Sequence, residues 1–415
     1  MTQRYDKYKD SGVQWLGEIP GHWGMSKISS HFRQRNEKVS DKDYPALSVS
    51  KQGVTPQLEK VALSNAEGAS RKLVKVGDYA VNSRSDRKGS CGVSKYEGSV
   101  SLITIVLEPF NIDGEYVHYL FRSNPWVEEF YRNGRGIVAD LWTTNYQMMK
   151  SMYMPVPPLS EQKQIVSYLD AKCGMIDEWV IKKQKEVEHL QELKQRVIAD
   201  AVTRGLNPHA KMKATNIPWL TEIPEHWEMR KMKYIFDERS EKNHPDEPML
   251  SATQSEGVIL QSKYQGRVVV VNTSFEGLKL VQVGDFVIHL RSFQGGIEYA
   301  HDRGIISSAY TILAPKHPEF SAYYKRLFKS SSFIDLLKIC VTGIREGQNI
   351  NYSKLKQFFI PLPPLSEQKQ IVSYLDDKTS KIDKLIANIT KEMEAIKEYK
   401  QRLISDVVTG QIKVC

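Results

Sequence analysis

The sequence is poor in cysteine and has no long apolar run. Its four cysteines, Cys91, Cys173, Cys340 and Cys415, form no Cys-x-x-Cys pair, so their spacing offers neither a zinc site nor a redox couple. The longest apolar runs, such as that within Arg267–Val271, are far shorter than the roughly 20 residues needed to span a bilayer. The N-terminus is polar and charged. We therefore expect a protein of the reducing cytoplasm without a membrane segment.

Familiar catalytic motifs are also missing. The sequence has no Gly-x-x-x-x-Gly-Lys-Ser/Thr phosphate loop, no His-Glu-x-x-His zinc helix and no Gly-x-Ser-x-Gly elbow. Its double prolines lack the polar and aromatic neighbours that amino-methyltransferases use to hold a flipped base. The histidines form no cluster with metal-ligand spacing, and we interpret His22 and His226, each beside a tryptophan, as packed structural residues. We expect neither catalysis nor a metal site in this chain.

What is present is the composition of a globular protein. Of the 415 residues, 40 % are hydrophobic and 26 % are charged. At about 150 residues per domain, this length predicts two to four domains. Lys plus Arg exceed Asp plus Glu by 58 − 49 = 9, an excess that favours a polyanionic partner without identifying one.

The sequence repeats itself over its whole length. The matched motifs are PPLSEQKQIVSYLD at 157–170 and 363–376, WLxEIPxHW at 15–23 and 219–227, and Val-Gly-Asp at 76–78 and 283–285. Because solenoid repeats run to only about 20–50 residues, offsets of this size indicate a duplicated domain. Residues 25–150 and 229–356 have diverged, so one scaffold is expected to carry two different surfaces.

The segment that closes each copy is predicted to be a long helix. A Pro-x-Pro-Pro sequence cannot continue a helix, and Ser160 and Ser366 follow it as N-cap candidates. Apolar residues then recur at alternating spacings of three and four, the a/d pattern of a coiled coil. The two seams are Val166, Leu169, Cys173, Ile176, Val180, Lys183, Val187, Leu190, Lys194, Val197 and Ala201, and Val372, Leu375, Thr379, Ile382, Ile386, Ile389, Met393, Ile396, Lys400, Leu403 and Val407. At ~1.5 Å per residue, each helix of about 44 residues would be roughly 65 Å long.

Each seam needs a partner, and the simplest partner is the seam of the other copy. A pseudo-two-fold axis across the pair requires the helices to be antiparallel, with one diverged domain at each end. The alternative is that each helix packs into its own domain, which suits a narrow a/d stripe less well. We expect the helices to act as a spacer.

The diverged regions are expected to be mixed α+β domains. Strands are predicted at Tyr79–Val81, Leu102–Leu107, Arg267–Val271, Phe286–Leu290 and Ala309–Leu313. Short helices are predicted at Tyr116–Phe121, Trp126–Tyr131 and Phe320–Phe328.

Two polar loops in each copy are candidates for contact with DNA. One follows the Val-Gly-Asp strand and the other precedes the proline-rich junction. Arg can bond guanine through both O6 and N7, Asn or Gln can bond adenine similarly, and Ser or Lys can bind phosphate. The candidates are Asn82, Arg84, Ser85, Arg87, Lys88, Arg135, Thr143, Thr144 and Asn145, and Arg291, Ser292, Gln294, Arg345, Gln348, Asn349 and Asn351. The alternative that any one of them is only a solvated loop residue stays open.

The whole layout resembles the specificity subunit of type I restriction-modification systems. The resemblance is carried by Trp-Leu-x-x-Ile-Pro-x-x-Trp, Val-Gly-Asp before a strand, and Pro-x-Pro-Pro-Leu-x-Glu-Gln at a helix start, each present twice. It implies an α+β fold with two pseudo-two-fold-related target recognition domains separated by two long antiparallel coiled-coil helices. The implied segments are recognition domains at 1–154 and 209–360, a central spacer helix at 155–208 and a C-terminal spacer helix at 361–415.

The resemblance also implies a non-catalytic subunit that reads a bipartite, asymmetric site in double-stranded DNA. Such a subunit would dock two adenine-N6 methyltransferase subunits and, through them, restriction subunits. Cofactors would belong to the partners, with S-adenosylmethionine in the methyltransferase and ATP and Mg in the restriction subunit. A rigid spacer would turn two weak half-site contacts into one selective site.

Residues that are identical in both copies but lie off the seam are candidates for docking the methyltransferase. They are Glu161, Gln162, Tyr168 and Arg196, and Glu367, Gln368, Tyr374 and Arg402. Two symmetry-related copies of one surface would offer two equal sites. Recent recombination between the segments would leave the same identities without any contact, and is the competing explanation.

Two other functions would share parts of this pattern. A stand-alone duplicated DNA-binding repressor would carry the same recognition loops but would copurify without a methyltransferase. A nuclease or methyltransferase fusion would need a segment to host its chemistry, and no segment is left unassigned. In the second case the purified chain alone would transfer methyl groups to DNA, which we do not expect.

Overall fold

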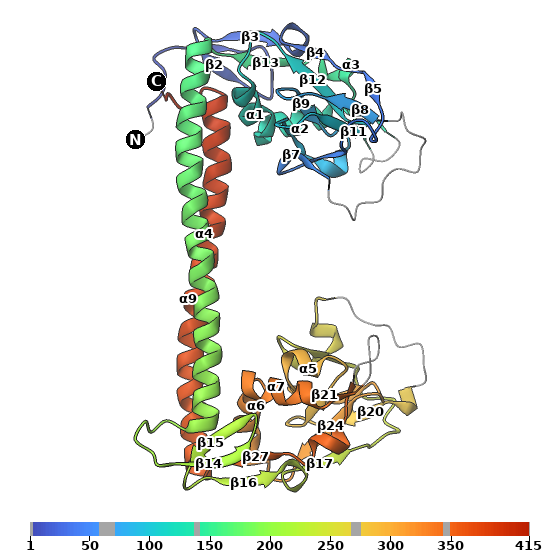
Figure 1. Cartoon of the computed structure of the whole chain (residues 1–415), viewed down its shortest axis with the longest axis vertical. Helices are drawn as coiled ribbons and strands as arrows, with labels where there is room; N and C mark the ends of the chain where they lie inside the picture. Colours follow the sequence, from blue (N-terminus) through green and yellow to red (C-terminus); the bar gives the residue numbers. More distant parts are fainter. Residues whose placement is uncertain (1–2, 58–70, 137–141, 267–274, 343–348, 415) are drawn as a thin grey trace. The chain divides into compact units, whose positions relative to one another are not determined.

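The computed structural model describes residues 3–57, 71–136, 142–266, 275–342 and 349–414 (Figure 1). It contains two compact units. Unit 1 comprises Met1–Lys183 and Lys391–Cys415, and unit 2 comprises Gln184–Thr390. Each unit therefore contains the start of one long helix and the end of the other.

Unit 1 is built on an antiparallel sheet with the strand order β10-β9-β12-β4. These strands are β4 (Phe32–Gln34), β9 (Tyr79–Val81), β10 (Cys91–Val93) and β12 (Ile105–Pro109). The remaining strands are β1 (Tyr8–Asp10), β2 (Glu18–Pro20), β3 (Gly24–Lys27), β5 (Lys38–Val39), β6 (Leu47–Ser50), β7 (Gly53–Pro56), β8 (Arg71–Val74), β11 (Gly98–Ser101) and β13 (Tyr153–Val156). The short helices are α1 (Gly114–Arg122), α2 (Asn124–Arg132) and α3 (Tyr146–Met149).

Unit 2 repeats this topology. Its main sheet has the order β17-β24-β21-β22, which matches that of unit 1 strand for strand. These strands are β17 (Phe236–Arg239), β21 (Phe286–Ile288), β22 (Glu298–Tyr299) and β24 (Thr311–Pro315). The others are β14 (Met212–Ile217), β15 (Leu220–Pro224), β16 (Glu228–Lys231), β18 (Leu250–Thr253), β19 (Gly257–Leu260), β20 (Lys279–Val281), β23 (Gly304–Ile306), β25 (Val341–Thr342), β26 (Asn349–Ile350) and β27 (Phe359–Leu362). The short helices are α5 (Ser292–Gly295), α6 (Ser321–Leu327), α7 (Ser331–Ile339) and α8 (Tyr352–Leu355).

Most of the predicted short elements are confirmed. Tyr79–Val81 is β9, and the strands predicted at Phe286–Leu290 and Ala309–Leu313 overlap β21 and β24. The strand predicted at Leu102–Leu107 is wrong in its first half, because residues 102–104 form the turn between β11 and β12. Arg267–Val271 lies outside the described residues. The three predicted short helices correspond to α1, α2 and α6.

The long helices are α4 (Leu159–Arg204) and α9 (Leu365–Val408), of 46 and 44 residues. Each begins one residue before its predicted N-cap, so Ser160 and Ser366 lie inside the first turn. After each helix comes a glycine with positive φ, Gly205 at +73° and Gly410 at +76°. This left-handed conformation ends a helix at little cost only when the residue is glycine.

The pairing of the helices is antiparallel within each unit. The antiparallel course of α4 and α9 is visible in Figure 1. In unit 1, Lys400 of α9 bonds Asp177 of α4 at 2.7 Å. In unit 2, Lys194 near the end of α4 bonds Asp383 of α9 at 2.6 Å. Both lysines occupy predicted seam positions, so their stems pack while their ammonium groups reach the facing helix.

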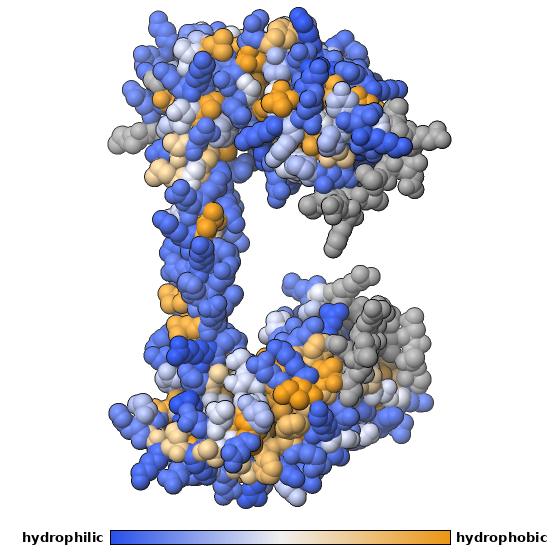
Figure 2. Space-filling view, in the orientation of Figure 1, coloured by the Kyte–Doolittle hydropathy of each residue, from blue (hydrophilic) through white to orange (hydrophobic). Residues whose placement is uncertain are grey.

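The predicted seam is buried or half-buried, but the helix ends pack differently. Among seam residues, Leu169, Cys173, Val187, Ala201, Leu375, Ile382, Ile389, Met393, Leu403 and Val407 are buried. Near the ends, Ile165 and Ile404 enter the core of unit 1, and Ile198 and Ile371 enter that of unit 2, all from off-seam positions. Elsewhere the outer surface of the helices is mainly hydrophilic (Figure 2). Each long helix thus pairs with the other helix along the seam and packs into the core of a unit near its ends.

Candidate nucleic-acid interface

The Val-Gly-Asp motif anchors the first recognition loop of each unit. Asp78, 2 % exposed, accepts hydrogen bonds from Arg35 Nε at 2.7 Å and from the Lys75 amide at 2.8 Å. Asp285, equally buried, accepts the same pair of bonds from Arg239 Nε and the Gln282 amide, each at 2.8 Å. This clamp holds the turn that leads into β9 or β21, and the polar loop leaves from the far end of that strand.

The two polar loops of unit 1, which the sequence presented separately, form one surface. The Ser85 amide donates to Trp142 O at 2.9 Å, and the Thr144 amide donates to Ser83 O at 3.0 Å. Arg135 and Thr143 exchange a pair of backbone bonds at 3.1 Å within the second loop. A ligand that met one loop would therefore meet the other.

Several predicted contacts of unit 1 present their side chains to solvent. The Arg84 and Arg87 side chains are 44 % and 65 % exposed, and Arg84 is bonded to Asp86. Lys88 is paired with Glu128 at 2.9 Å. Arg135 and Thr143 are exposed, as is Asn145, although Asn145 also caps α3 through the Met148 amide. Asn82 and Ser85 are half-buried.

Two predicted DNA contacts are wrong, because their side chains are inside the protein. Thr144 is fully buried, and its Oγ1 donates to Phe130 O at 2.9 Å. Ser292 is also fully buried, and its Oγ accepts a bond from the His289 amide at 2.9 Å. Both hydroxyls hold the backbone of a loop in place.

In unit 2, Arg291 and Gln294 are exposed at the start and within α5. Asn351 is exposed and caps α8 through the Lys354 amide at 3.0 Å. Asn349 contributes backbone to β26, and α5 contacts this strand, so here too the two loop regions meet. Arg345 and Gln348 lie outside the described residues. All of these stay predictions.

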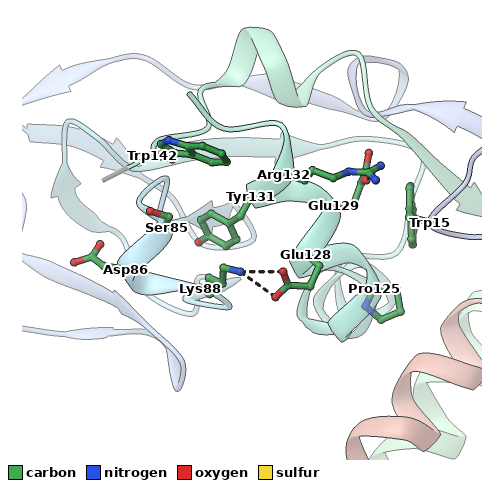
Figure 3. A pocket seen from close by; sticks show the side chains of 10 residues that line it. All are labelled: Trp15, Ser85, Asp86, Lys88, Pro125, Glu128, Glu129, Tyr131, Arg132 and Trp142. Carbon is green, nitrogen blue, oxygen red and sulfur yellow. Dashed lines mark hydrogen bonds and ion pairs between the residues drawn. The ribbon is translucent and has the colours of Figure 1, made fainter. Parts of the chain in front are cut away.

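A cavity of about 820 Å³ adjoins the unit 1 loops (Figure 3). Its lining includes Ser85 and Lys88 from the first loop together with Trp15, Tyr131 and Trp142. The predicted DNA-contact residues were all polar and did not include these aromatic side chains. The position of Trp142 directly before Thr143 was the signal that could have added it to the candidates.

In each unit, the tryptophan motif is hydrogen-bonded to a glutamate at the start of a long helix. Glu161 Oε1 accepts a bond from Trp23 Nε1 at 3.1 Å, and its Oε2 lies 2.8 Å from His22 Nε2. In unit 2, Glu367 Oε2 accepts a bond from Trp227 Nε1 at 2.9 Å and lies 2.8 Å from His226 Nε2. Both histidines thus contact a structural glutamate, but their side chains are 51 % and 54 % exposed, so they are less packed than the sequence interpretation expected.

The burial of these helix starts shows that several of the predicted docking residues are wrong. Glu161, Gln162 and Gln368 are 6 %, 1 % and 2 % exposed, which leaves a partner protein nothing to touch. Gln162 and Gln368 each donate to a proline carbonyl, Pro157 O and Pro363 O, at 2.8 Å. These residues are identical in the two copies because they build the same junction twice, and Glu367 serves it too. Tyr168, Tyr374, Arg196 and Arg402 are exposed or half-exposed and stay predicted docking residues.

His118 on α1 should make unit 1 sensitive to acid. Burial and the neighbouring Arg122 lower the pKa of His118 from 6.5 to about 4. The unfolded chain therefore binds more protons than the folded chain between these values, so stability should rise with pH across this interval. We expect a loss on the order of 2 kcal/mol from about pH 7 to about pH 4.5, measured by urea unfolding. His118→Gln should flatten this dependence, and an unchanged slope in that variant would assign the acid sensitivity to another group.

Within the parts of the chain that the structure describes, no group of three or more metal-binding side chains converges, and no helix is long and apolar enough to cross a membrane. Cys91, Cys173 and Cys340 are buried free thiols. What the geometry presents, in each unit, is a polar loop surface carried on a duplicated scaffold and held by two long helices. This arrangement defines a duplicated recognition protein.

Comparisons with known proteins find similarity to one family. The profile of the type I restriction modification DNA specificity domain matches residues 221–395. The chain is 26 % identical to the type I restriction enzyme MjaVIII specificity subunit of Methanocaldococcus jannaschii, over 95 % of this chain and 94 % of that one. Over nearly its whole length the chain is thus similar to a specificity subunit of a type I restriction-modification system, a non-catalytic kind of subunit, and residues 221–395 match the DNA specificity domain of that family.

Solved structures share the fold. The HsdS subunit from Thermoanaerobacter tengcongensis matches with a TM-score of 0.50 and 17 % identity, over 95 % of this chain and 98 % of that one. A chain from a structure described as "Structural basis underlying complex assembly and conformational transition of the type I R-M system" matches with a TM-score of 0.66 and 15 % identity, over 94 % and 98 %. The α+β fold with long paired helices, expected from the sequence, is confirmed.

Proposed function

We propose that this chain reads an asymmetric, bipartite sequence in double-stranded DNA, with one half-site for each unit. The observation that carries this proposal is that two units of the same topology present loops of different sequence at equivalent places. In unit 1 the loop after β9 offers Arg84, Arg87 and Lys88, whereas the loop after β21 in unit 2 offers Arg291 and Gln294. Different donors and acceptors at the same place favour different bases.

The long helices would set the gap between the half-sites. Each is a continuous helix, and their pairing combines a buried apolar seam with lysine–aspartate bonds. A stiff connection keeps the entropic cost of engaging the second half-site low when the gap is right, and prevents it when the gap is wrong. Neither half need bind tightly alone.

The chain would act in a cytoplasmic assembly. We assign it two adenine-N6 methyltransferase subunits as direct partners, and restriction subunits as partners reached through them. S-adenosylmethionine would be held by the methyltransferase, and ATP and Mg by the restriction subunit. This chain itself would supply recognition and attachment.

An exchange of recognition regions tests the bipartite reading. Residues 25–150 are replaced by a copy of 229–356, so that both units carry the same loops. The wild-type complex should methylate a non-palindromic motif, and the exchanged chain should methylate a palindrome made of the second half-site alone. Methylome sequencing of cells carrying either chain measures both. A palindromic motif for the wild-type chain, or an unchanged motif after exchange, would contradict the proposal.

The stand-alone repressor is the competing function, and it makes a different prediction. A repressor would bind its site at full affinity without a methyltransferase, and deletion of the gene would leave the methylome unchanged. The same sequencing experiment, with and without the gene, therefore separates the two functions.

A further inference from the structure

Each unit has a cation at the same structural position, although the surrounding sequences have diverged. Arg122 is the last residue of α1, just before α2, and Lys329 lies between α6 and α7. Each is followed by a serine, Ser123 or Ser330, whose Oγ donates at 2.7 Å to the carbonyl oxygen three residues earlier. The shared turn makes the two cations equivalent.

Both cations bond the turn of the neighbouring β-hairpin. Arg122 Nη2 donates to Lys51 O, in the turn between β6 and β7. Lys329 Nζ donates to Gln254 O at 3.3 Å, in the turn between β18 and β19. Unlike specific side-chain pairs, a bond to a backbone carbonyl does not depend on the residue at the turn, so it can persist while the turn sequence changes.

Lys329 makes two further bonds, and these reach the recognition loop. Its Nζ donates to Gly295 O at 2.9 Å, at the end of α5, and to Glu298 Oε1 at 2.6 Å, at the start of β22. Glu298 is completely buried, and His289, at the start of the loop, lies 3.6 Å from the same carboxylate oxygen. One ammonium group thus joins the hairpin turn, the recognition loop and the strand that follows the loop.

The packing around this junction leaves no room for a side chain at two glycines. Gly296 has a φ of +87°, and a Cβ there would lie 2.1 Å from Phe328 O. Gly257, with a φ of +78°, would bring a Cβ to 2.6 Å from Tyr299 O. Both contacts are between backbone segments, so the loop and the hairpin are pressed against the α6–α7 junction and against β22.

We propose that Lys329 is a positioning residue for DNA specificity: it holds the loop of Arg291 and Gln294 against the hairpin and so decides which bases unit 2 accepts, without touching DNA. The Lys329 side chain is 29 % exposed and the Glu298 side chain is buried. Ion pairs with a buried member add little net stability, and their best-attested use is to select one conformation. A recognition surface needs such support from residues behind it. Arg122 would have the corresponding role in unit 1. This inference rests on the proposed function.

The test uses the full chain assembled with its methyltransferase, and a set of duplexes that each differ by one base pair in one half-site. Lys329→Met alone would leave the Glu298 carboxylate buried and unpaired, which strongly destabilises a protein. The main variant is therefore Lys329→Met with Glu298→Gln, which removes both charges. We expect discrimination at the unit 2 half-site to fall about tenfold, the order of one lost base-pair preference, and discrimination at the other half-site to stay unchanged.

Two further variants serve as controls. Lys329→Arg keeps a cation at the junction and should restore most of the discrimination. Arg122→Met should produce the reciprocal result, with loss confined to the half-site of unit 1. Because both half-sites are read by one molecule, the unaffected half reports that folding and assembly are intact.

Other results would overturn the inference. If the double variant unfolds at the wild-type temperature and keeps full discrimination at both half-sites, Lys329 does not position the loop. An equal loss at both half-sites would show general destabilisation instead of positioning. If the wild-type complex itself methylates without sequence preference, it is the proposed function that fails, and this control is run first.

Discussion

Loss of the methyltransferase from the purified complex is the expected result of changing Tyr168 and Tyr374 to Ala and reversing the charges of Arg196 and Arg402. Each surface combines the start of one long helix with the end of the other. In unit 1, Tyr168 lies on α4 and its partner Arg402 lies on α9. In unit 2 the same surface is made by Tyr374 of α9 and Arg196 of α4.

The exposed neighbours of these residues support a docking surface. Tyr399, one turn before Arg402 on the same helix face, is 47 % exposed, and its equivalent Leu193 is 48 % exposed beside Arg196. The Arg196 side chain is 82 % exposed, with only a 3.7 Å contact to Asp200. Aromatic and arginine side chains of this kind carry most of the binding energy of protein interfaces. Tyr168 also packs against the core of unit 1, so the exposed Arg196, Arg402 and Tyr374 are the residues whose identity in both copies favours docking most.

A matched control separates docking from a general charge effect. Lys182→Glu and Lys384→Glu reverse two exposed helix lysines whose counterparts in the other copy are Asn388 and Glu178. This control chain should copurify with the methyltransferase as the wild type does. Retention of the methyltransferase by the quadruple variant would place docking elsewhere and leave recombination as the explanation of the repeated residues.

A longer gap between the half-sites is expected when one heptad is added to both long helices. The two ion pairs indicate where to add it. The residue numbers in Asp177–Lys400 and in Lys194–Asp383 have the same sum, so both pairs belong to one antiparallel register. The midpoint of that register lies between Lys185 and Glu186 in α4 and between Lys391 and Glu392 in α9. Seven residues at ~1.5 Å each add about 10 Å of helix and preserve the a/d register. At ~3.4 Å per base pair, the gap should grow by about three base pairs.

The measurement is again the methylated motif. The lengthened chain should stop methylating the original site, while the bases read at each half-site stay the same. A control with three added residues in each helix breaks the a/d register and overwinds the coiled coil locally, so the pairing of the helices should be weakened. An unchanged gap in the heptad variant would show that the helices do not set the distance.

Much of the candidate site was within reach of sequence reasoning, because local patterns place loops well. The polar stretches after β9 and β21 lie where predicted, and Arg84, Arg87, Arg291 and Gln294 are exposed there. What local patterns cannot supply is the environment of each side chain. Thr144 and Ser292 have the same polar character as their neighbours, and only the packing against Phe130 and His289 puts them inside.

The sequence by itself determined the duplication, the two long helices and the antiparallel pairing of their seams, because repeats and a/d spacing are properties of the chain alone. Only the tertiary structure explains why certain residues are identical in the two copies. Glu161 and Gln162 are identical to Glu367 and Gln368 because each pair closes the same buried junction, a contact between segments more than a hundred residues apart for the glutamates. It also brought the Lys329 ammonium to a hairpin and a loop that are distant in sequence. Such contacts depend on which segments the fold places together, and no local pattern encodes that.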